Sequence, residues 1–496
     1  MNKNYDITNE MKIFIVLLFL IVPNPVLAYN EVIELNDLIS YAYKTSTDIE
    51  LYKIHQELNR KNYEVAMHAT MPTLKFSIAP QYSHSISPVT QPDGSMLNKD
   101  VNNLYFVPTL SFSTPIPFTG GTLSVSSNFN YYQYKKEHRI SKNYSMNIYN
   151  INISQPLNFL NLQKWSKRTN RVNYFMNNLQ YLKDYLDIKE IIIKQYFDIA
   201  KYREILIAYS YLKNNMYEIL AEYQQLYVEG KILKQELNEI NIVLTELGEK
   251  ILFNEVLLKH ATTDLNNYLN NKIDIDSLKF TIPLSSFVHV DSLKAQNILK
   301  QKQILYSNIS TIPFKRSLAE CKSKRGLDAT LNIGLGQNTQ STQISHLFDN
   351  KTPSANISIS LNVPITDIKS RKAQYHIAKL KLVENQRKNE IESERERNYL
   401  ALYIEKFKCT KERYNHLLIK ENNLKDKMNL FYTLLKAKKV LFEKYHDVIN
   451  DYLMNKIELL SVLKDIYLLY CQIEELTMYN FVDDINYLNS TNTHIS

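Results

Sequence analysis

The side chains that most often perform chemistry are scattered in this sequence of 496 residues. The three cysteines, Cys321, Cys409 and Cys471, are far apart and form no CxxC motif, so they predict neither a disulfide framework nor a zinc site. The 11 histidines form no HExxH motif and no close pair, and no GxSxG motif frames a serine nucleophile. We therefore expect no enzymatic activity, no bound metal and no cofactor.

Composition excludes two further classes of function. The chain has only 8 glycines, and their close pairs are Gly120 with Gly121 and Gly334 with Gly336. Because a phosphate-binding loop needs several glycines close together, a nucleotide-binding fold is not expected. The formal net charge of +8 is spread among interleaved acidic and basic residues, so we expect no nucleic-acid partner. The 36 tyrosines favour boundaries between apolar and wet surroundings.

The N-terminus has the features of an export signal. Lys12 precedes an apolar run from Ile13 to Val22, and small residues follow up to Ala28. This run of 10 residues is too short to span a bilayer as a helix, but it suits the core of a signal peptide that comprises residues 1–28. No later stretch reaches the roughly 18 apolar residues of a membrane helix. The exported protein is therefore either soluble or inserted as a β-barrel.

Two regions of the chain alternate between apolar and polar residues, which predicts strands with one apolar face. The first region, about 72–157, contains four such segments, and Gly120 and Gly121 form the turn between the second and third. The second region, about 327–364, contains two. An aromatic run, Tyr131-Tyr132-Gln133-Tyr134, at the end of one segment fits the aromatic girdle of a membrane barrel.

Long helices are predicted between and after these strands. About 70 residues from Asn158 to Val228 contain neither proline nor glycine, and as a helix they would extend about 105 Å. Apolar positions seven residues apart form more than one stripe, so this helix should pack on several neighbours with a left-handed supercoil. Gly230 then breaks the helix, and a second limb returns to about Asn270.

The same plan occurs twice, which indicates an internal duplication. The first repeat covers 29–270, with strands at about 72–157 and a helical hairpin at about 158–270. A linker at 271–286 leads to the second repeat, 287–482, with strands at about 327–364 and a hairpin at about 365–480. Residues 483–496 are predicted to be a disordered tail. The expected fold is α+β and consists mainly of long α-helices.

Several short stretches, in this order, resemble one known family. They are Met71-Pro72-Thr73-Leu74, Ser154-Gln155-Pro156-Leu157, Glu229-Gly230-Lys231-Ile232, Lys324-Arg325-Gly326-Leu327, Val363-Pro364-Ile365 and Leu476-Thr477-Met478-Tyr479. Over about residues 30–482 the chain resembles the outer membrane efflux protein family, the TolC-like channels, in the form found in Bacteroidetes-type sequences.

The resemblance implies a homotrimer with a shared β-barrel in the outer membrane and an α-helical barrel in the periplasm. It further implies a passive export duct, the outer-membrane channel of a tripartite efflux pump or type I secretion system. Its partners would be outer-membrane lipid, a periplasmic adaptor (membrane fusion) protein and an inner-membrane transporter. Drug efflux and protein secretion both remain open, because specificity largely resides in the inner-membrane partner. The first repeat has an extra hairpin, around Gly120 and Gly121; the trimer would have 18 strands if this hairpin joins the barrel and 12 if it lies outside.

The resemblance also assigns residues to the periplasmic end. Glu236, six residues after Gly230, and Asp451 match acidic positions that ring the constriction in the family. Alternatively, both are solvated acids near helix N-termini, where the helix dipole favours them. In the second repeat no glycine marks the turn, and residues 443–448 are placed there. The candidates for adaptor docking are Glu229, Gly230, Lys231, Tyr445, His446 and Asp447.

A different class of function also fits the pattern. A secreted coiled-coil protein could carry the β segments as a small adhesive head, in a structural or binding role. Fractionation with the outer membrane and trimers whose migration changes on heating would support the channel, whereas release in soluble form would support the secreted protein.

Overall fold

The computed structural model describes residues 32–488, apart from 91, 137–138, 159, 272–278, 281–288, 326–327 and 364–365. The predicted signal peptide, residues 1–28, lies outside the described residues. Most of the predicted linker and residues 489–496 of the predicted tail also lie outside them.

The described chain divides into two compact units. One unit contains residues up to 54, 182–295 and 399–485, and the other contains 55–181, 296–398 and the residues from 486 onward. Four helices contribute residues to both units. They are α3 (Thr47–His68), α4 (Leu162–Val228), α6 (Ser292–Ser310) and α8 (Ile368–Lys436).

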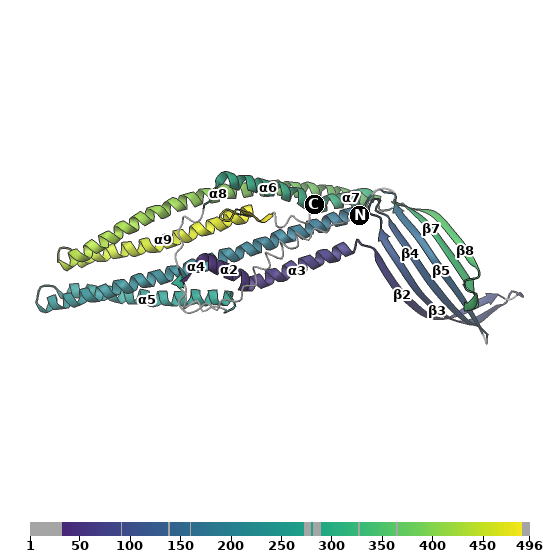
Figure 1. Ribbon diagram of the computed structural model, residues 1–496, viewed down its shortest axis with the longest axis horizontal. Coiled ribbons are helices and arrows are strands. Elements are labelled where there is room, and N and C mark those ends of the chain that lie inside the picture. The colour runs from purple at the N-terminus through teal and green to yellow at the C-terminus, as the bar shows by residue number, and fades with distance from the viewer. Residues whose placement is uncertain are drawn as a thin grey trace, which may run out of the picture. The chain divides into compact units, whose positions relative to one another are not determined.

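A six-stranded antiparallel sheet forms the β part of the second unit, and the short helix α7 (Ile312–Ser323) belongs to the same unit (Figure 1). The strands are β2 (Thr73–Thr90), β3 (Met96–Pro115), β4 (Thr122–Lys136), β5 (Arg139–Pro156), β7 (Asp328–Ser341) and β8 (Lys351–Asn362). Their spatial order is β2-β3-β4-β5-β7-β8, so four strands of the first repeat and two of the second share one sheet. The extra first-repeat hairpin is therefore part of this sheet.

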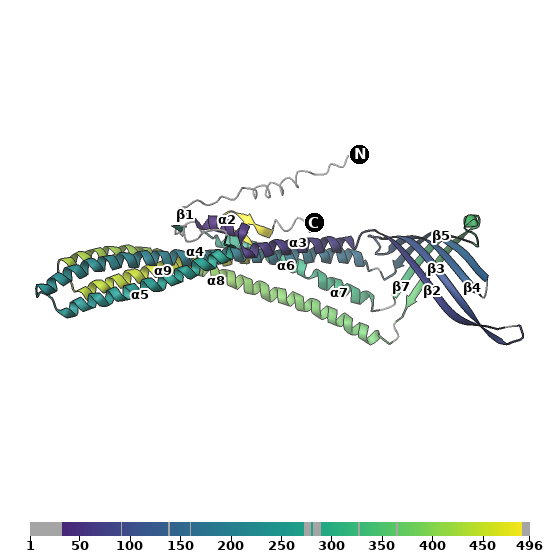
Figure 2. The same ribbon diagram turned by 90° about the horizontal axis from the view of Figure 1, so that it is seen from below.

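Two helical hairpins dominate the first unit. Helix α4 is followed by α5 (Lys234–Tyr268), and α8 is followed by α9 (Phe442–Thr477). Figure 2 shows the α4–α5 and α8–α9 turns at the same end of this unit. Strands followed by a hairpin occur twice, which confirms the expected α+β fold with long helices and a duplicated unit. None of the described helices is both long enough and apolar enough to cross a membrane.

Short elements complete the first unit. Helix α2 (Leu35–Thr45) follows β1 (Val32–Ile33), which pairs in parallel with β6 (Lys279–Phe280). This pairing places a described part of the predicted linker in a regular element. After α9 come β9 (Tyr479–Asn480) and β10 (Ile485–Asn486), which form a two-stranded sheet.

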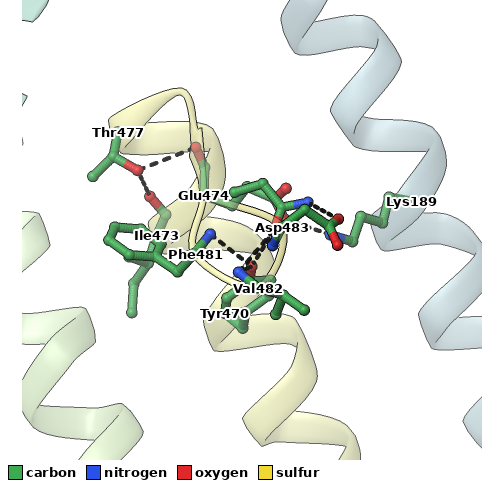
Figure 3. Close-up of polar contacts among 9 residues, drawn as sticks. Lys189, Tyr470, Ile473, Glu474, Thr477, Phe481, Val482 and Asp483 are labelled. Atoms are coloured by element: carbon green, nitrogen blue, oxygen red, sulfur yellow. Dashed lines mark hydrogen bonds and ion pairs between the residues drawn. The ribbon is translucent and has the colours of Figure 1, made fainter. Parts of the chain in front are cut away.

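The prediction of a disordered tail from residue 483 is wrong for the described residues 483–488. The hydroxyl of Tyr470 on α9 accepts hydrogen bonds from the backbone amides of Phe481 (3.1 Å) and Val482 (3.2 Å) and donates to Asn480 Oδ1 (3.0 Å). Figure 3 shows the chain folded back over α9 at this point. Asn480 Oδ1 also accepts from the amide of Asp483 at 3.0 Å. These bonds satisfy backbone groups up to Asp483, and the strand β10 follows at Ile485–Asn486, so the described part of the predicted tail has a defined structure.

Candidate functional site

The hairpin turns, where the resemblance places adaptor docking and the gate, have the same backbone geometry. Gly230 in the first turn has φ 70° and Lys438 in the second has φ 59°. The amide of Gly230 donates to Tyr227 O at 3.0 Å, and that of Lys438 donates to Leu435 O at 2.9 Å. The next amide in each turn reaches back five residues, from Lys231 to Leu226 O and from Lys439 to Leu434 O, both at 2.9 Å. The two turns are therefore structural equivalents.

This equivalence corrects the predicted position of the second turn. Helix α8 ends at Lys436 and α9 begins at Phe442, so residues 443–448 lie inside α9 rather than in the turn. The prediction was wrong because no glycine marks the position: Lys438 adopts the left-handed conformation at a cost of about 1 kcal/mol. The apolar pair that follows each position, Ile232-Leu233 and Val440-Leu441, is the sequence signal that could have located it.

Tyr445 is part of the core beneath the turns rather than of their surface. Its side chain is 1% exposed and belongs to a cluster contributed by all four helices of the two hairpins. The cluster consists of Ile205, Tyr209, Leu212, Met216 and Ile219 of α4, Ile240, Val243, Leu244 and Leu247 of α5, Met428 and Leu435 of α8, and Phe442, Tyr445, Val448, Ile449 and Leu453 of α9. Burial, with smaller effects of Tyr432 and Tyr211, raises the pKa of Tyr445. The prediction of Tyr445 as a docking residue is therefore wrong, because its side chain is buried in the core that supports the turns.

The other second-repeat candidates lie on the first turns of α9. His446 is half-buried, stacks on the ring of Phe442 with centroids 6.3 Å apart, and places Nε2 3.2 Å from Asn450 Nδ2. Asp447 is exposed. Of these two residues, Asp447 is thus the more accessible to a partner.

The first-repeat candidates are all exposed at the turn itself. Lys231 Nζ lies 2.7 Å from Glu229 Oε2. The hydrogen bond and charge of Lys231 hold the pKa of Glu229 below its usual range, and the charge of Lys438 contributes. The two turns are thus close enough for their charges to interact. Because this ion pair is solvent-exposed, it contributes little stability and leaves the charges available to a partner.

The two gate candidates lie on different helices, one in each of the two helical hairpins. Glu236 is half-buried in the first turn of α5, and its charge adds to burial in raising the pKa of Tyr223. Asp451 is exposed on α9, and Met454, one turn further, is 68% exposed. No interaction between Glu236 and Asp451 is found in the described part of the chain. A gate formed by copies of Asp451 stays a prediction.

The sheet separates apolar and polar side chains onto two faces. Its register places Leu74 opposite Phe112, Phe112 opposite Val125, and Val125 opposite Ile151. The exposed large apolar residues of the sheet all fall on this one face, which we call the apolar face. They are Leu74, Phe76, Ile78, Tyr82, Ile86, Met96, Leu104, Phe106, Leu110, Phe112, Ile140, Tyr149, Leu335, Ile357, Ile359 and Leu361. On this face the rings of Tyr131 and Tyr144 lie 5.3 Å apart, centroid to centroid.

The opposite face, which we call the polar face, consists mainly of serine, threonine and asparagine. Its central part includes Ser77, Ser111, Thr109, Ser124, Ser126, Asn150, Asn152, Asn332, Ser358 and Ser360. Gly334 also lies there, and a Cβ at this position would approach Asn356 Oδ1 to 2.0 Å. Glycine therefore leaves room for the asparagine side chain across the strand.

The β3–β4 turn is tied to the start of α4. Asn161 donates through Nδ2 to Pro117 O at 2.6 Å. Gly120 has φ 78°, and a Cβ there would lie 2.9 Å from the Cα of Asn161. A Cβ on Gly121 would lie 2.8 Å from Ser154 O. The glycine pair noted in the sequence thus allows the turn to approach the β5–α4 connection closely.

The residues that the structure describes offer no candidate metal site. They contain no group of three or more histidine, cysteine, aspartate or glutamate side chains that could hold a metal ion. Cys321, Cys409 and Cys471 are all free thiols, and only Cys471 is buried.

No protein-family model and no curated protein sequence matches the chain. Solved structures do match. The outer membrane protein VceC from Vibrio cholerae superposes with a TM-score of 0.61 at 11% identity, covering 89% of this chain and 96% of its own. The outer membrane channels MtrE of Neisseria gonorrhoeae (TM-score 0.59, 15% identity, 89% and 88% covered) and CmeC of Campylobacter jejuni (0.60, 12%, 93% and 90%) are similar. Similarity at this level of identity establishes a common fold.

Proposed function

We propose that this chain, whose fold is that of solved outer membrane channels, is the outer-membrane component of a tripartite efflux pump or type I secretion system. It would act as a passive export duct across the periplasm and the outer membrane. The observation that carries this proposal is the division of the sheet into an exposed apolar face and a polar face.

An apolar face of this kind needs an apolar environment. Leu74 on one outer strand and Ile357 on the other are 71% and 76% exposed, and the same face is apolar on the strands between them. Contiguous apolar surface is rare on soluble monomers, and it marks a protein interface or a membrane. Transmembrane barrels have this alternation, with apolar residues toward lipid and polar residues toward the lumen.

The height of the apolar face also fits a bilayer. On β3 the uninterrupted apolar part of this face extends from Leu104 to Phe112. Nine residues of a strand tilted by about 40° rise roughly 23 Å, close to the apolar band of about 25 Å on outer-membrane barrels. Phe106, Tyr131 and Tyr144 lie opposite one another at one end of this band, where aromatic girdles occur.

The helices supply the periplasmic part of the proposed duct. Helix α4 has 67 residues and α8 has 69, so each is about 100 Å long. The proposed assembly is a homotrimer, because an open sheet edge in lipid would leave backbone groups without hydrogen bonds. The exposed turns around Glu229 and Lys438 are the proposed contacts for a periplasmic adaptor, which would connect the duct to an inner-membrane transporter.

The competing proposal, a secreted coiled-coil protein with an adhesive β head, explains less. Such a head would expose its apolar face to water, where it would promote aggregation. Its strands would also have no need for an apolar band of bilayer height.

Two neighbouring substitutions on β3 test the membrane assignment. Leu110 lies on the apolar face and is 48% exposed, whereas Thr109 points to the polar face. A lysine facing lipid near the midplane costs about 2–4 kcal/mol, so Leu110→Lys should reduce the protein recovered in the outer-membrane fraction. Thr109→Lys should be recovered like wild type. Equal recovery of both variants, or wild-type protein in the soluble fraction, would count against the duct.

A further inference from the structure

We propose that all six strands form the barrel wall and that β8 of one copy pairs with β2 of the next. Three copies, a number that rests on the proposed function, then close a barrel of 3 × 6 = 18 strands. The barrel would be a wide pore whose polar wall is uncharged in its central part.

The two outer strands are suited to pair with each other. In the described sheet β2 pairs only with β3, and β8 pairs only with β7. Five successive antiparallel pairings connect them, so β2 and β8 run in opposite directions. Copies arranged around an axis would therefore join these edges in an antiparallel ladder, and the backbone groups of the residues that lie opposite one another would gain partners.

The β2–β3 hairpin belongs to the wall rather than to a separate head. It pairs continuously from Thr73 opposite Ser113 to Thr90 opposite Met96. Its apolar face carries Leu74, Phe76 and Ile78, which are 71%, 63% and 50% exposed. Outside the membrane these apolar side chains would be exposed to water, whereas in the barrel wall they continue the lipid-facing surface to its edge.

The β3–β4 connection holds the hairpin in the sheet. Thirteen residue pairs join β3 to β4, including Phe112 with Val125 and Phe106 with Tyr131. The turn between these strands is hydrogen-bonded to Asn161 at the start of α4. Displacing the hairpin would break this ladder and this anchor together.

Eighteen strands make a pore of porin size. With strands about 4.8 Å apart and tilted by about 40°, the backbone radius is about 18 Å, compared with about 12 Å for 12 strands. Barrels of 16–18 strands leave an aqueous channel. Near the helices the polar face carries Lys75 and Asp328, which pairs with Arg371 at 3.3 Å, and the register places Lys99, Lys136 and Arg139 on this face at the opposite end of the strands. Its central part, by contrast, consists of uncharged residues. The central part of the wall would therefore admit hydrated molecules of either charge, and selection by charge would take place at its ends or elsewhere in the duct.

Disulfide trapping between copies tests the pairing of β2 with β8. Cys321 and Cys409 would be replaced by serine, and the buried Cys471 would remain. Cysteines would then be introduced at Ser358 on β8 and, one at a time, at Lys75, Ser77 or Ala79 on β2, because the register between copies is open. Within one copy β2 and β8 are five strand spacings apart, about 24 Å, so any disulfide joins two copies.

The matched control places the second cysteine at Ser124, Ser126 or Asn128 on β4. These positions would lie next to β8 of another copy only if the β2–β3 hairpin left the wall. We expect oxidised membranes to yield covalent dimers and trimers from at least one β2–β8 variant and only monomers from the β4–β8 variants. Crosslinking through β4, or none from any variant in membrane-extracted trimers, would overturn the 18-strand barrel while leaving the duct intact.

The failure of the proposed function would look different. Fractionation of the same variants before oxidation shows whether the protein reaches the outer membrane. Soluble monomers there would overturn the duct and the barrel together, whereas heat-modifiable trimers in the membrane fraction support the duct independently of the crosslinks.

Discussion

Lys189 of α4 and Glu474 of α9 form an ion pair in the interior of the first unit. Lys189 donates through Nζ to Glu474 Oε2 at 2.6 Å, and the side chains are 17% and 1% exposed (Figure 3). The ammonium also lies 5.1 Å from the ring centroid of Tyr470, which holds the C-terminal segment. A helix of the first repeat is thereby tied to a helix of the second, next to the point where the chain folds back.

The first prediction concerns this pair. Lys189→Met leaves the carboxylate of Glu474 buried without its cation, which should cost about 3–5 kcal/mol and clearly lower the thermal midpoint of the purified protein. Adding Glu474→Gln removes the charge and should recover most of the loss. Equal midpoints for the single and double variants would show that an unpaired buried carboxylate is not the cause of the loss.

The second prediction concerns the equivalent turn positions. Gly230→Lys forces a side chain into a left-handed conformation and should destabilise the protein by about 1 kcal/mol, although a Cβ there meets no atom within 4 Å. Lys438→Gly relieves the same strain and should leave the thermal midpoint unchanged or raise it. If both variants lower the midpoint, side-chain contacts rather than backbone conformation determine these turns.

The third prediction concerns pH. Burial, with the charges of Glu475 and Asp184, raises the pKa of Asp187, and burial with Asp187 and Glu475 raises the pKa of Glu190. A raised carboxyl pKa means that ionisation destabilises the folded state, so this penalty is full at neutral pH and absent below the unfolded pKa. Asp187→Asn should therefore raise the thermal midpoint at pH 7, and the gain should vanish below about pH 3.5.

A matched control for the pH prediction is Asp198→Asn on the same helix. Asp198 Oδ1 lies 2.8 Å from Lys464 Nζ, so neutralising it removes an attraction and should lower the midpoint at pH 7. A gain from Asp187→Asn that persists in acid would point to a cause other than charge.

The fourth prediction concerns the proposed gate. In planar bilayers the wild-type protein should give small, cation-selective steps, because three copies of Asp451 around an axis would favour cations. Asp451→Ala should enlarge the steps or reduce their selectivity. The control, Asp447→Ala, removes an exposed acid one turn earlier on α9 and should leave both unchanged. Unchanged steps with Asp451→Ala would move the gate to other residues.

Local patterns in the sequence predicted the elements of this fold. The alternation of apolar and polar residues located the six strands, and the long stretches without proline or glycine located α4 and α8. Gly230 identified the first turn. These features were predictable because strand period, helix period and glycine are properties of neighbouring residues. The second turn was missed because Lys438 adopts a conformation that its residue type disfavours.

Tertiary structure decided how these elements combine. The sequence left open whether the extra hairpin joins the sheet; the pairing of β3 with β4 and of β5 with β7 places all six strands in one sheet. Tyr445 was an exposed candidate by its position in the chain, and only the packing of four helices shows that it is buried. Likewise, Asn480 Oδ1 accepts a hydrogen bond from the amide of Asp483, the first residue of the predicted disordered tail. Contacts between residues distant in sequence determine these features, so local sequence propensities could not predict them.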